Sequence, residues 1–223
     1  MFPLRDNIRS RTAPAMTWLI IALNCAMFFI EASLPGPRLE RLVGELGMIP
    51  ARLGEDPAAW TTLVTSVFLH GGWLHLLSNM WMLYLFGDNV EDRMGKARYL
   101  VFYLACGVAA GLAHWAFAPR SPVPVVGASG AIAGVLGAYF LLYPRARVLT
   151  LIPIFIYPLF VEVPAVLFLG LWFASQLFQG TVTVLNPHLF SPVAFWAHAG
   201  GFVAGMALLP AFVEPPANRR SDV

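Results

Sequence analysis

Apolar residues along the chain form six long runs that are separated by shorter, more polar stretches. The runs cover Ala15–Leu34, Trp73–Gly87, Tyr99–Phe117, Gly127–Tyr143, Val163–Phe178 and Ala194–Phe212. A helix needs about 20 mostly apolar residues to cross the hydrocarbon core of a bilayer. The pattern therefore predicts an all-α polytopic membrane protein with six transmembrane helices. The second and fourth runs are short for a crossing and would need flanking apolar residues.

A further apolar stretch, Val148–Val161, lies between the fourth and fifth runs and contains Pro153 and Pro158. Two prolines this close together disfavour an unbroken helix. We therefore interpret the stretch as an interfacial or re-entrant segment that precedes the fifth helix. A seventh transmembrane span is the alternative.

The composition also indicates a membrane protein. Hydrophobic residues make up 58% of the 223 positions and charged residues 12%, and the mean hydropathy is +0.69. Soluble domains are roughly 45–50% apolar and about 25% charged. The composition excludes a soluble enzyme and a disordered chain. A net charge of +2 is too small to indicate nucleic-acid binding.

Basic residues set the expected orientation, because Lys and Arg concentrate in cytoplasmic loops. With six spans, one side of the membrane would hold Arg5, Arg9, Arg11, Arg93, Lys96, Arg98, Arg145, Arg147, Arg219 and Arg220, and the other Arg38, Arg41, Arg52 and Arg120. Both termini are therefore expected in the cytoplasm. The resulting organisation is a tail at 1–14, a six-helix membrane domain at 15–213 with an outer loop at about 35–65, and a second tail at 214–223.

Small residues recur at a spacing that brings helices together. Gly130 and Gly134 are four residues apart in the fourth run, as are Gly201 and Gly205 in the sixth. Such pairs let two helix backbones approach closely in lipid. We expect the fourth and sixth helices to be in contact.

Polar residues are rare in these runs, and a polar residue within a membrane helix often marks a functional site. His75 and Asn79 of the second run are four residues apart, so a helix places both on one face. Both side chains can donate hydrogen bonds. The alternative is a buried polar pair that only ties helices together.

Ser129 and His198 form the second candidate pair. Ser129 begins the fourth helix, where free backbone N–H groups could stabilise an oxyanion, and His198 would lie at the same depth in the sixth. A serine becomes a nucleophile when a base such as histidine lies beside it. We find no acidic residue at this depth, which predicts a Ser-His dyad rather than a triad. An N-cap serine and a structural histidine are the alternatives.

Three motifs carry a resemblance to a known family: His70-Gly-Gly-Trp-Leu-His75-Leu-Leu-Ser-Asn79, Gly127-Ala-Ser129-Gly130 and Ala197-His198-Ala-Gly-Gly201. Together they resemble the rhomboid family of intramembrane serine proteases, over about residues 60–209. The resemblance implies a six-helix rhomboid-like bundle in which Ser129 is the nucleophile and His198 the general base. It further implies an oxyanion hole of His75, Asn79 and the Ser129 backbone N–H. His70 matches a position that is usually structural.

The chain departs from the family pattern at two places. Many members carry Trp-Arg in the first outer loop, whereas Trp60 is followed here by Thr61. Many also carry an aromatic residue four positions after the serine, packed against the base, where this chain has Ala133. The first departure affects how the loop is anchored, and the second affects the stacking on His198.

The resemblance implies an endopeptidase that cuts transmembrane substrates near the outer face through an acyl-enzyme, without metal or cofactor. The expected location is the bilayer, as an integral multi-pass protein of a bacterial plasma membrane. Zinc proteases are not indicated, because His-Glu-x-x-His is missing. An aspartyl protease or a transporter is also not indicated, since paired membrane aspartates and an internal repeat are missing. A catalytically inactive rhomboid-like binding protein is the remaining alternative.

Overall fold

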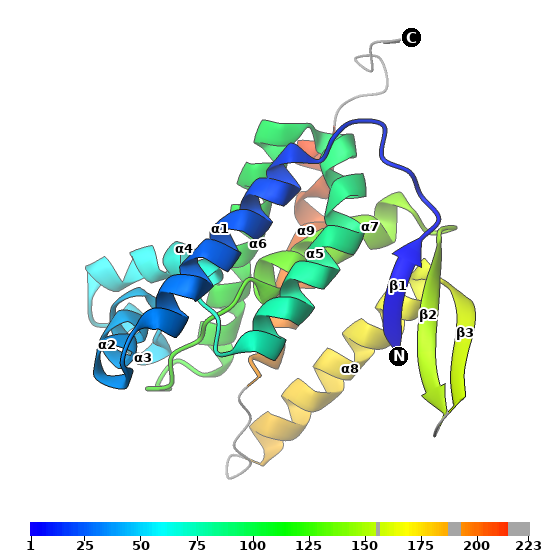
Figure 1. Ribbon diagram of the computed structural model, residues 1–223. Helices are drawn as coiled ribbons and strands as arrows, with labels where there is room; N and C mark the ends of the chain where they lie inside the picture. The colour runs from blue at the N-terminus through cyan, green and yellow to red at the C-terminus, as the bar shows by residue number, and fades with distance from the viewer. Residues whose placement is uncertain (155–156, 187–192, 214–223) are drawn as a thin grey trace.

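Long helices form the body of the molecule (Figure 1). The computed structural model describes residues 1–154, 157–186 and 193–213. The long helices are α1 (Ala15–Ser33), α5 (Trp73–Met94), α6 (Lys96–Phe117), α7 (Ser129–Leu142), α8 (Ala165–Leu185) and α9 (Phe195–Phe212). Each of the six predicted runs therefore overlaps one of these helices. The predicted tail at 214–223 lies outside the described residues.

Four of these helices, α1, α6, α8 and α9, are long and apolar enough to cross a membrane. Helix α7 is apolar but shorter, with 14 residues. Helix α5 has 22 residues and carries charged side chains, Asp88, Glu91, Asp92 and Arg93, in its last two turns. The chain is an integral membrane protein that is mostly helical.

The prediction of an all-α chain is wrong at one place, where a three-stranded antiparallel sheet lies beside the helices (Figure 1). Strand β1 (Phe2–Asp6) pairs with β2 (Arg147–Ile154), which pairs with β3 (Tyr157–Pro164). The described residues of the stretch predicted to be interfacial or re-entrant thus lie in two paired strands, and the alternative of a seventh transmembrane span is wrong. Prolines disfavour a helix here, whereas β-branched and aromatic residues favour strands. Pro153 and Pro158 face each other across the hairpin.

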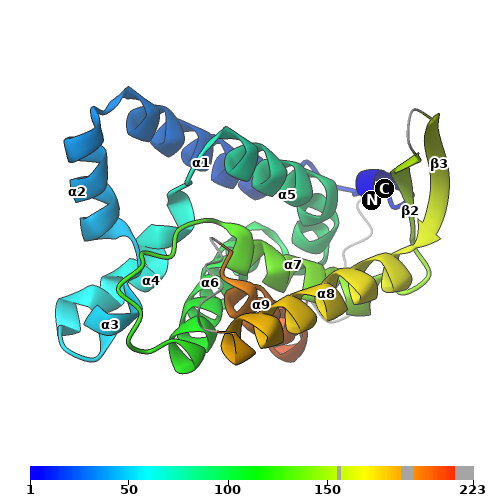
Figure 2. The same ribbon diagram turned by 90° about the horizontal axis from the view of Figure 1, so that it is seen from below.

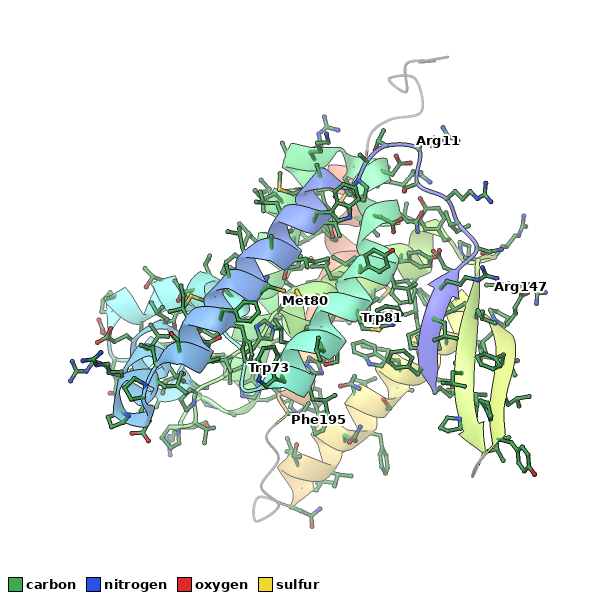
Figure 3. The ribbon with its side chains drawn as sticks, in the orientation of Figure 1. Arg11, Trp73, Met80, Trp81, Arg147 and Phe195 are labelled. Atoms are coloured by element: carbon green, nitrogen blue, oxygen red, sulfur yellow. The ribbon has the colours of Figure 1, made fainter. Side chains whose placement is uncertain are left out.

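Strand β1 is attached to α5 and α7 by side-chain hydrogen bonds. Trp81 lies between α5 and β1 (Figure 3), and its Nε1 donates to the Pro3 carbonyl at 2.7 Å. The Asp6 carboxylate accepts from Asn89 Nδ2 at 2.9 Å and from the Tyr139 hydroxyl at 2.5 Å. These bonds fix the first residues of the chain against the helices.

Helix α1 begins without a capping side chain of its own, because Pro14 precedes it. Glu91 of α5 supplies the missing acceptor. Its carboxylate accepts from the backbone N–H of Met16 at 3.0 Å and of Thr17 at 2.8 Å, and from the Thr17 hydroxyl at 2.8 Å. A carboxylate at a helix N-terminus satisfies free N–H groups and complements the helix dipole. The two helices are therefore tied together at this end.

Helix α7 lies in the middle of the bundle and packs against α9 through glycine (Figure 2). A Cβ on Gly201 would lie 2.1 Å from the Gly130 carbonyl oxygen, and one on Gly205 would lie 2.0 Å from the Gly134 oxygen. These distances leave no room for a side chain. The predicted contact between the fourth and sixth helices is confirmed.

The segment predicted as a long outer loop is largely helical. It comprises α2 (Gly36–Leu46), α3 (Pro50–Leu53), the 3-10 helix Pro57–Thr61, α4 (Thr62–Thr65) and the 3-10 helix Ser66–Phe68. Trp60 anchors it, donating from Nε1 to the Leu53 carbonyl at 3.1 Å and packing edge-on against Trp115 of α6. The tryptophan therefore holds this segment without the arginine of the family pattern.

Candidate active site

Ser129 is the first residue of α7 and follows a sharply turned backbone. Gly127 has φ +128, a conformation that L side chains rarely adopt. Its N–H donates to the Ser66 carbonyl at 2.9 Å, which attaches the turn to the segment before α5. The turn places the serine at the free N-terminus of a helix, where backbone N–H groups point outward and the dipole is positive.

His198 lies in the first turn of α9, directly opposite this serine. Its Nε2 is 2.8 Å from Ser129 Oγ. The glycine packing between α7 and α9 fixes this distance, because Gly130 directly follows the serine and meets Ala197 and Gly201. The structure thus brings together the two residues predicted as nucleophile and base, although they are 69 positions apart.

His75 and Asn79 lie one turn apart on α5, with His75 closer to the start of the helix. The Gly71 N–H donates to His75 Nδ1 at 3.3 Å, so the imidazole carries its proton on Nε2. A Cβ on Gly127 would lie 2.8 Å from this Nε2 and 3.7 Å from Ser129 Oγ. The absence of a side chain at Gly127 therefore lets His75 Nε2 and Ser129 Oγ both lie close to the backbone beside Gly127.

Asn79 is buried one turn further along α5. Among the described residues, its Nδ2 has no hydrogen-bond partner. A buried amide donor without a partner is costly unless a ligand or water completes it. Asn79 therefore presents an unpaired amide donor one turn from His75.

His70, which the resemblance implies to be structural, lies against Glu31 of α1 and His75 of α5. Its backbone N–H donates to the two oxygens of the buried Glu31 carboxylate at 3.2 and 3.3 Å. Its ring packs edge-on against the His75 ring, with centroids 5.1 Å apart. Burial, assisted by the neighbouring His75, lowers the pKa of His70 to about 4, so the ring is neutral at physiological pH. The neutral His70 ring therefore packs against the His75 ring and limits how it can move.

Sequence reasoning missed Gln176 of α8. Its Oε1 lies 2.8 Å from His198 Nδ1, the ring nitrogen on the side away from the serine. The sequence did contain a signal, an amide within the apolar run Val163–Phe178. Its partner could not be identified, since the contact depends on how α8 packs against α9.

Trp172, one turn before Gln176, lies beside the same histidine. The Trp172 and His198 rings have centroids 6.0 Å apart and are inclined by 31°. Ala133, the position at which many rhomboids carry an aromatic residue, is fully buried. An aromatic neighbour of His198 therefore comes from α8 instead of α7.

This arrangement has the parts that acyl transfer requires. A hydroxyl is paired with an imidazole nitrogen, and the N–H donor of His75 lies at the same glycine turn as the hydroxyl. Histidine–serine pairing of this kind suits hydrolysis of an ester or amide.

Comparison with known proteins gives a consistent result. A Rhomboid domain model matches residues 57–215. The chain is 38% identical to the rhomboid protease GluP of Bacillus subtilis over 126 residues, 56% of this chain and 24% of GluP. It is 33% identical to YdcA of the same organism over 141 residues, 62% of this chain and 68% of YdcA.

A further relative is the rhomboid protease AarA of Providencia stuartii, which is 28% identical over 153 residues, 61% of this chain and 54% of AarA. The chain spans only about a quarter of GluP and about half of AarA. The residues that the Rhomboid domain model matches, 57–215, include Ser129, His198 and His75. Because the domain model covers well over half of the sequence, the chain belongs to the rhomboid family.

Proposed function

We propose that this protein is an intramembrane serine endopeptidase that cleaves transmembrane segments near the outer face of the bilayer. Ser129 is the nucleophile and His198 the general base. The observation that supports this most directly is the 2.8 Å separation of Ser129 Oγ and His198 Nε2. Relatives named as rhomboid proteases, GluP and AarA, support the same activity.

In the first step, His198 Nε2 takes the hydroxyl proton while Ser129 Oγ attacks the scissile carbonyl carbon. The carbonyl oxygen becomes an oxyanion in the space beside Gly127. Donors for this oxygen are His75 Nε2, Asn79 Nδ2 and the Ser129 backbone N–H. One such donor is worth roughly 10²–10³ in rate.

In the second step, the C–N bond breaks and the protonated His198 gives its proton to the departing amine. The product is an acyl-enzyme on Ser129. Water then enters, loses a proton to His198 and attacks the ester carbonyl, which releases the carboxylic acid and restores the serine. Water must reach the site for this step, so the cavity has to open towards the outer solvent.

The substrate is a transmembrane protein. Peptide carbonyls in an intact helix are already hydrogen-bonded and shielded, so the segment to be cut has to unwind locally. Helix-breaking residues near the cut site favour this unwinding. Small residues at the cut itself suit a site that is bordered by Gly127 and Gly130.

The membrane topology is part of the proposal. Helices α1, α5, α6, α7, α8 and α9 cross the bilayer, both termini are cytoplasmic, and the membrane is a bacterial plasma membrane. The basic residues of the sequence support this orientation. The reaction described above uses no metal ion and no cofactor.

The test is cleavage of a single-span reporter by the full chain in liposomes. We expect wild type to cut the reporter and both Ser129→Ala and His198→Ala to lose cleavage while remaining folded. Ser33→Ala is the matched control, because Ser33 is exposed at the end of α1 and its hydroxyl donates to the Ile30 carbonyl at 2.7 Å. If folded wild type binds the reporter but never cuts it, the protein is a rhomboid-like binding protein and the proposal fails.

A further inference from the structure

We infer that Gln176 is a positioning residue that selects the tautomer of His198 able to act as the base. The inference rests on the proposed function, in which His198 accepts the Ser129 proton. It concerns a residue of α8 that bonds to His198 Nδ1, whereas the other ring nitrogen, Nε2, faces the serine.

The Trp172 carbonyl sets the donor and acceptor roles in the hydrogen bonds that link Ser175, Gln176 and His198. The Ser175 hydroxyl donates to the Trp172 carbonyl at 2.6 Å, which commits its only proton. Ser175 Oγ must then be the acceptor for Gln176 Nε2, which lies 3.1 Å away. The amide is thereby oriented with Oε1 towards His198.

Gln176 Oε1 can only accept, so His198 Nδ1, 2.8 Å away, carries the proton. In a neutral imidazole the other nitrogen, Nε2, then bears the lone pair. That lone pair faces Ser129 Oγ at 2.8 Å and can accept its proton. A reversed amide would set its oxygen against Ser175 Oγ and its NH₂ against Nδ1, which would favour the unproductive tautomer.

Gln176 Oε1 is a neutral acceptor for His198, and the three helices around it carry no carboxylate that could take its place. Helices α7, α8 and α9 contain no Asp, Glu, Lys or Arg. Among the described residues, the titratable groups near enough to interact with His198 by charge are His75 of α5 and His114 of α6. Gln176 therefore occupies the place that a carboxylate takes in a Ser-His-Asp triad, where the third residue fixes the tautomer of the histidine.

The test compares Gln176→Met, Gln176→Glu and Ser175→Ala in the liposome assay, with kcat and KM measured across pH. Methionine fills a similar volume but cannot accept from Nδ1 in the same way, and we expect kcat to fall roughly 10- to 100-fold with KM unchanged. Glutamate keeps the acceptor, so we expect it to retain kcat. Its negative charge stabilises protonated His198, which should move the acid limb of the pH profile to higher pH.

Ser175→Ala leaves Gln176 in place but removes the group that orients its amide, so we expect a smaller fall in kcat than for Gln176→Met. Thr183→Ala is the matched control. It lies on the same helix and removes a bond of the same kind, from Thr183 Oγ1 to the Gly180 carbonyl at 2.7 Å. We expect wild-type rates from this control.

Equal kcat values for wild type, Gln176→Met and Ser175→Ala would overturn the inference while leaving the proposed function intact. An equal loss in Gln176→Met and Gln176→Glu, with an unchanged pH profile and lowered thermal stability, would also overturn it, because it would indicate a purely structural residue. If wild type itself neither cuts the reporter nor reacts with a fluorophosphonate, the proposed function fails instead.

Discussion

Gly127 shows how a single backbone position can control the chemistry of the site. It has φ +128, and a Cβ there would lie 2.7 Å from His75 Cε1 and 2.8 Å from His75 Nε2. A side chain would therefore strain the turn before Ser129 and displace the His75 donor. Both effects act on the space that we assign to the oxyanion.

We predict that Gly127→Ala lowers kcat roughly 10²- to 10³-fold, the effect expected from losing one oxyanion donor. Reporter cleavage under saturating conditions measures this. Gly54→Ala is the control, since a Cβ at Gly54 meets nothing within 4 Å. Unchanged kcat in Gly127→Ala would contradict the assignment of this space.

The carboxyl group of Asp6 makes the stability of the folded protein depend on pH. Burial raises the pKa of Asp6 from 3.8 to about 6, the negative charge of Asp88 adds to the rise, and the hydrogen bond from Tyr139 opposes it. The folded state thus holds this proton more tightly than the unfolded state. Stability from this group is greatest below pH 4 and declines as pH rises to about 6.

We therefore predict that Asp6→Asn flattens the change in thermal stability between about pH 4 and pH 6. Thermal unfolding in detergent at a series of pH values would measure the effect. Asp56→Asn serves as the control, because its carboxylate only caps an exposed turn by accepting from the Ala58 N–H at 2.9 Å. The same pH dependence in Asp6→Asn and wild type would rule out this role for Asp6.

At this scale the sequence indicated much of the site. Ser129, His198, His75 and Asn79 could be singled out because polar side chains are conspicuous in apolar helices. Gln176 has the same property, but its role depends on a hydrogen bond between α8 and α9 across 22 residues. A pattern within either helix cannot show that the Gln176 and His198 side chains meet.

Among the elements, the contact between α7 and α9 determines where Ser129 and His198 meet. Gly201 and Gly205 place the α9 backbone against carbonyl oxygens of α7 at distances that admit no Cβ. The two catalytic candidates lie at the same end of this contact. Packing of the helices and alignment of the site therefore depend on the same residues.

We predict that Gly205→Ala lowers stability by about 1–3 kcal/mol, because the added Cβ would lie 2.0 Å from the Gly134 oxygen and force the helices apart. Denaturation in detergent would test this. In the control Gly170→Ala, the nearest atom to the added Cβ is Phe140 Cε2 at 3.9 Å, an ordinary contact. Equal stability of the two variants would argue against the tight glycine contact.

The helices could be predicted from runs of apolar residues, whereas the sheet could not. Strand β1 pairs with β2 across more than 140 positions. Apolar residues predominate on both faces of β2 and β3, so these strands lack the strict alternation that identifies a half-buried strand. Pro153 and Pro158 argued against a helix without indicating what replaced it.

For the whole molecule, the proposed orientation decides which face of the membrane the active site is open to. Ten of the fourteen basic residues fall on the side assigned to the cytoplasm. Ser129 and His198 lie at the starts of α7 and α9, which would be the outer ends of these helices. Substrates would therefore be cut near the outer face.

A matched pair of arginine substitutions tests this orientation. Arg120 and Arg145 are both exposed and lie in the connections that precede and follow α7. We predict that a membrane-impermeant maleimide added to intact cells labels Arg120→Cys and leaves Arg145→Cys unlabelled until the cells are lysed. Wild type is the background, because Cys106 is buried and Cys25 is half-buried. The reverse labelling pattern would invert the proposed topology.

The central claim is that Ser129 is a nucleophile activated by His198, and covalent labelling tests it most directly. We would treat the folded protein with a fluorophosphonate and locate the adduct by mass spectrometry. The account predicts an adduct on Ser129 in wild type and its loss in both Ser129→Ala and His198→Ala. Folded wild type without an adduct, or equal labelling of Ser129 in His198→Ala, would contradict it.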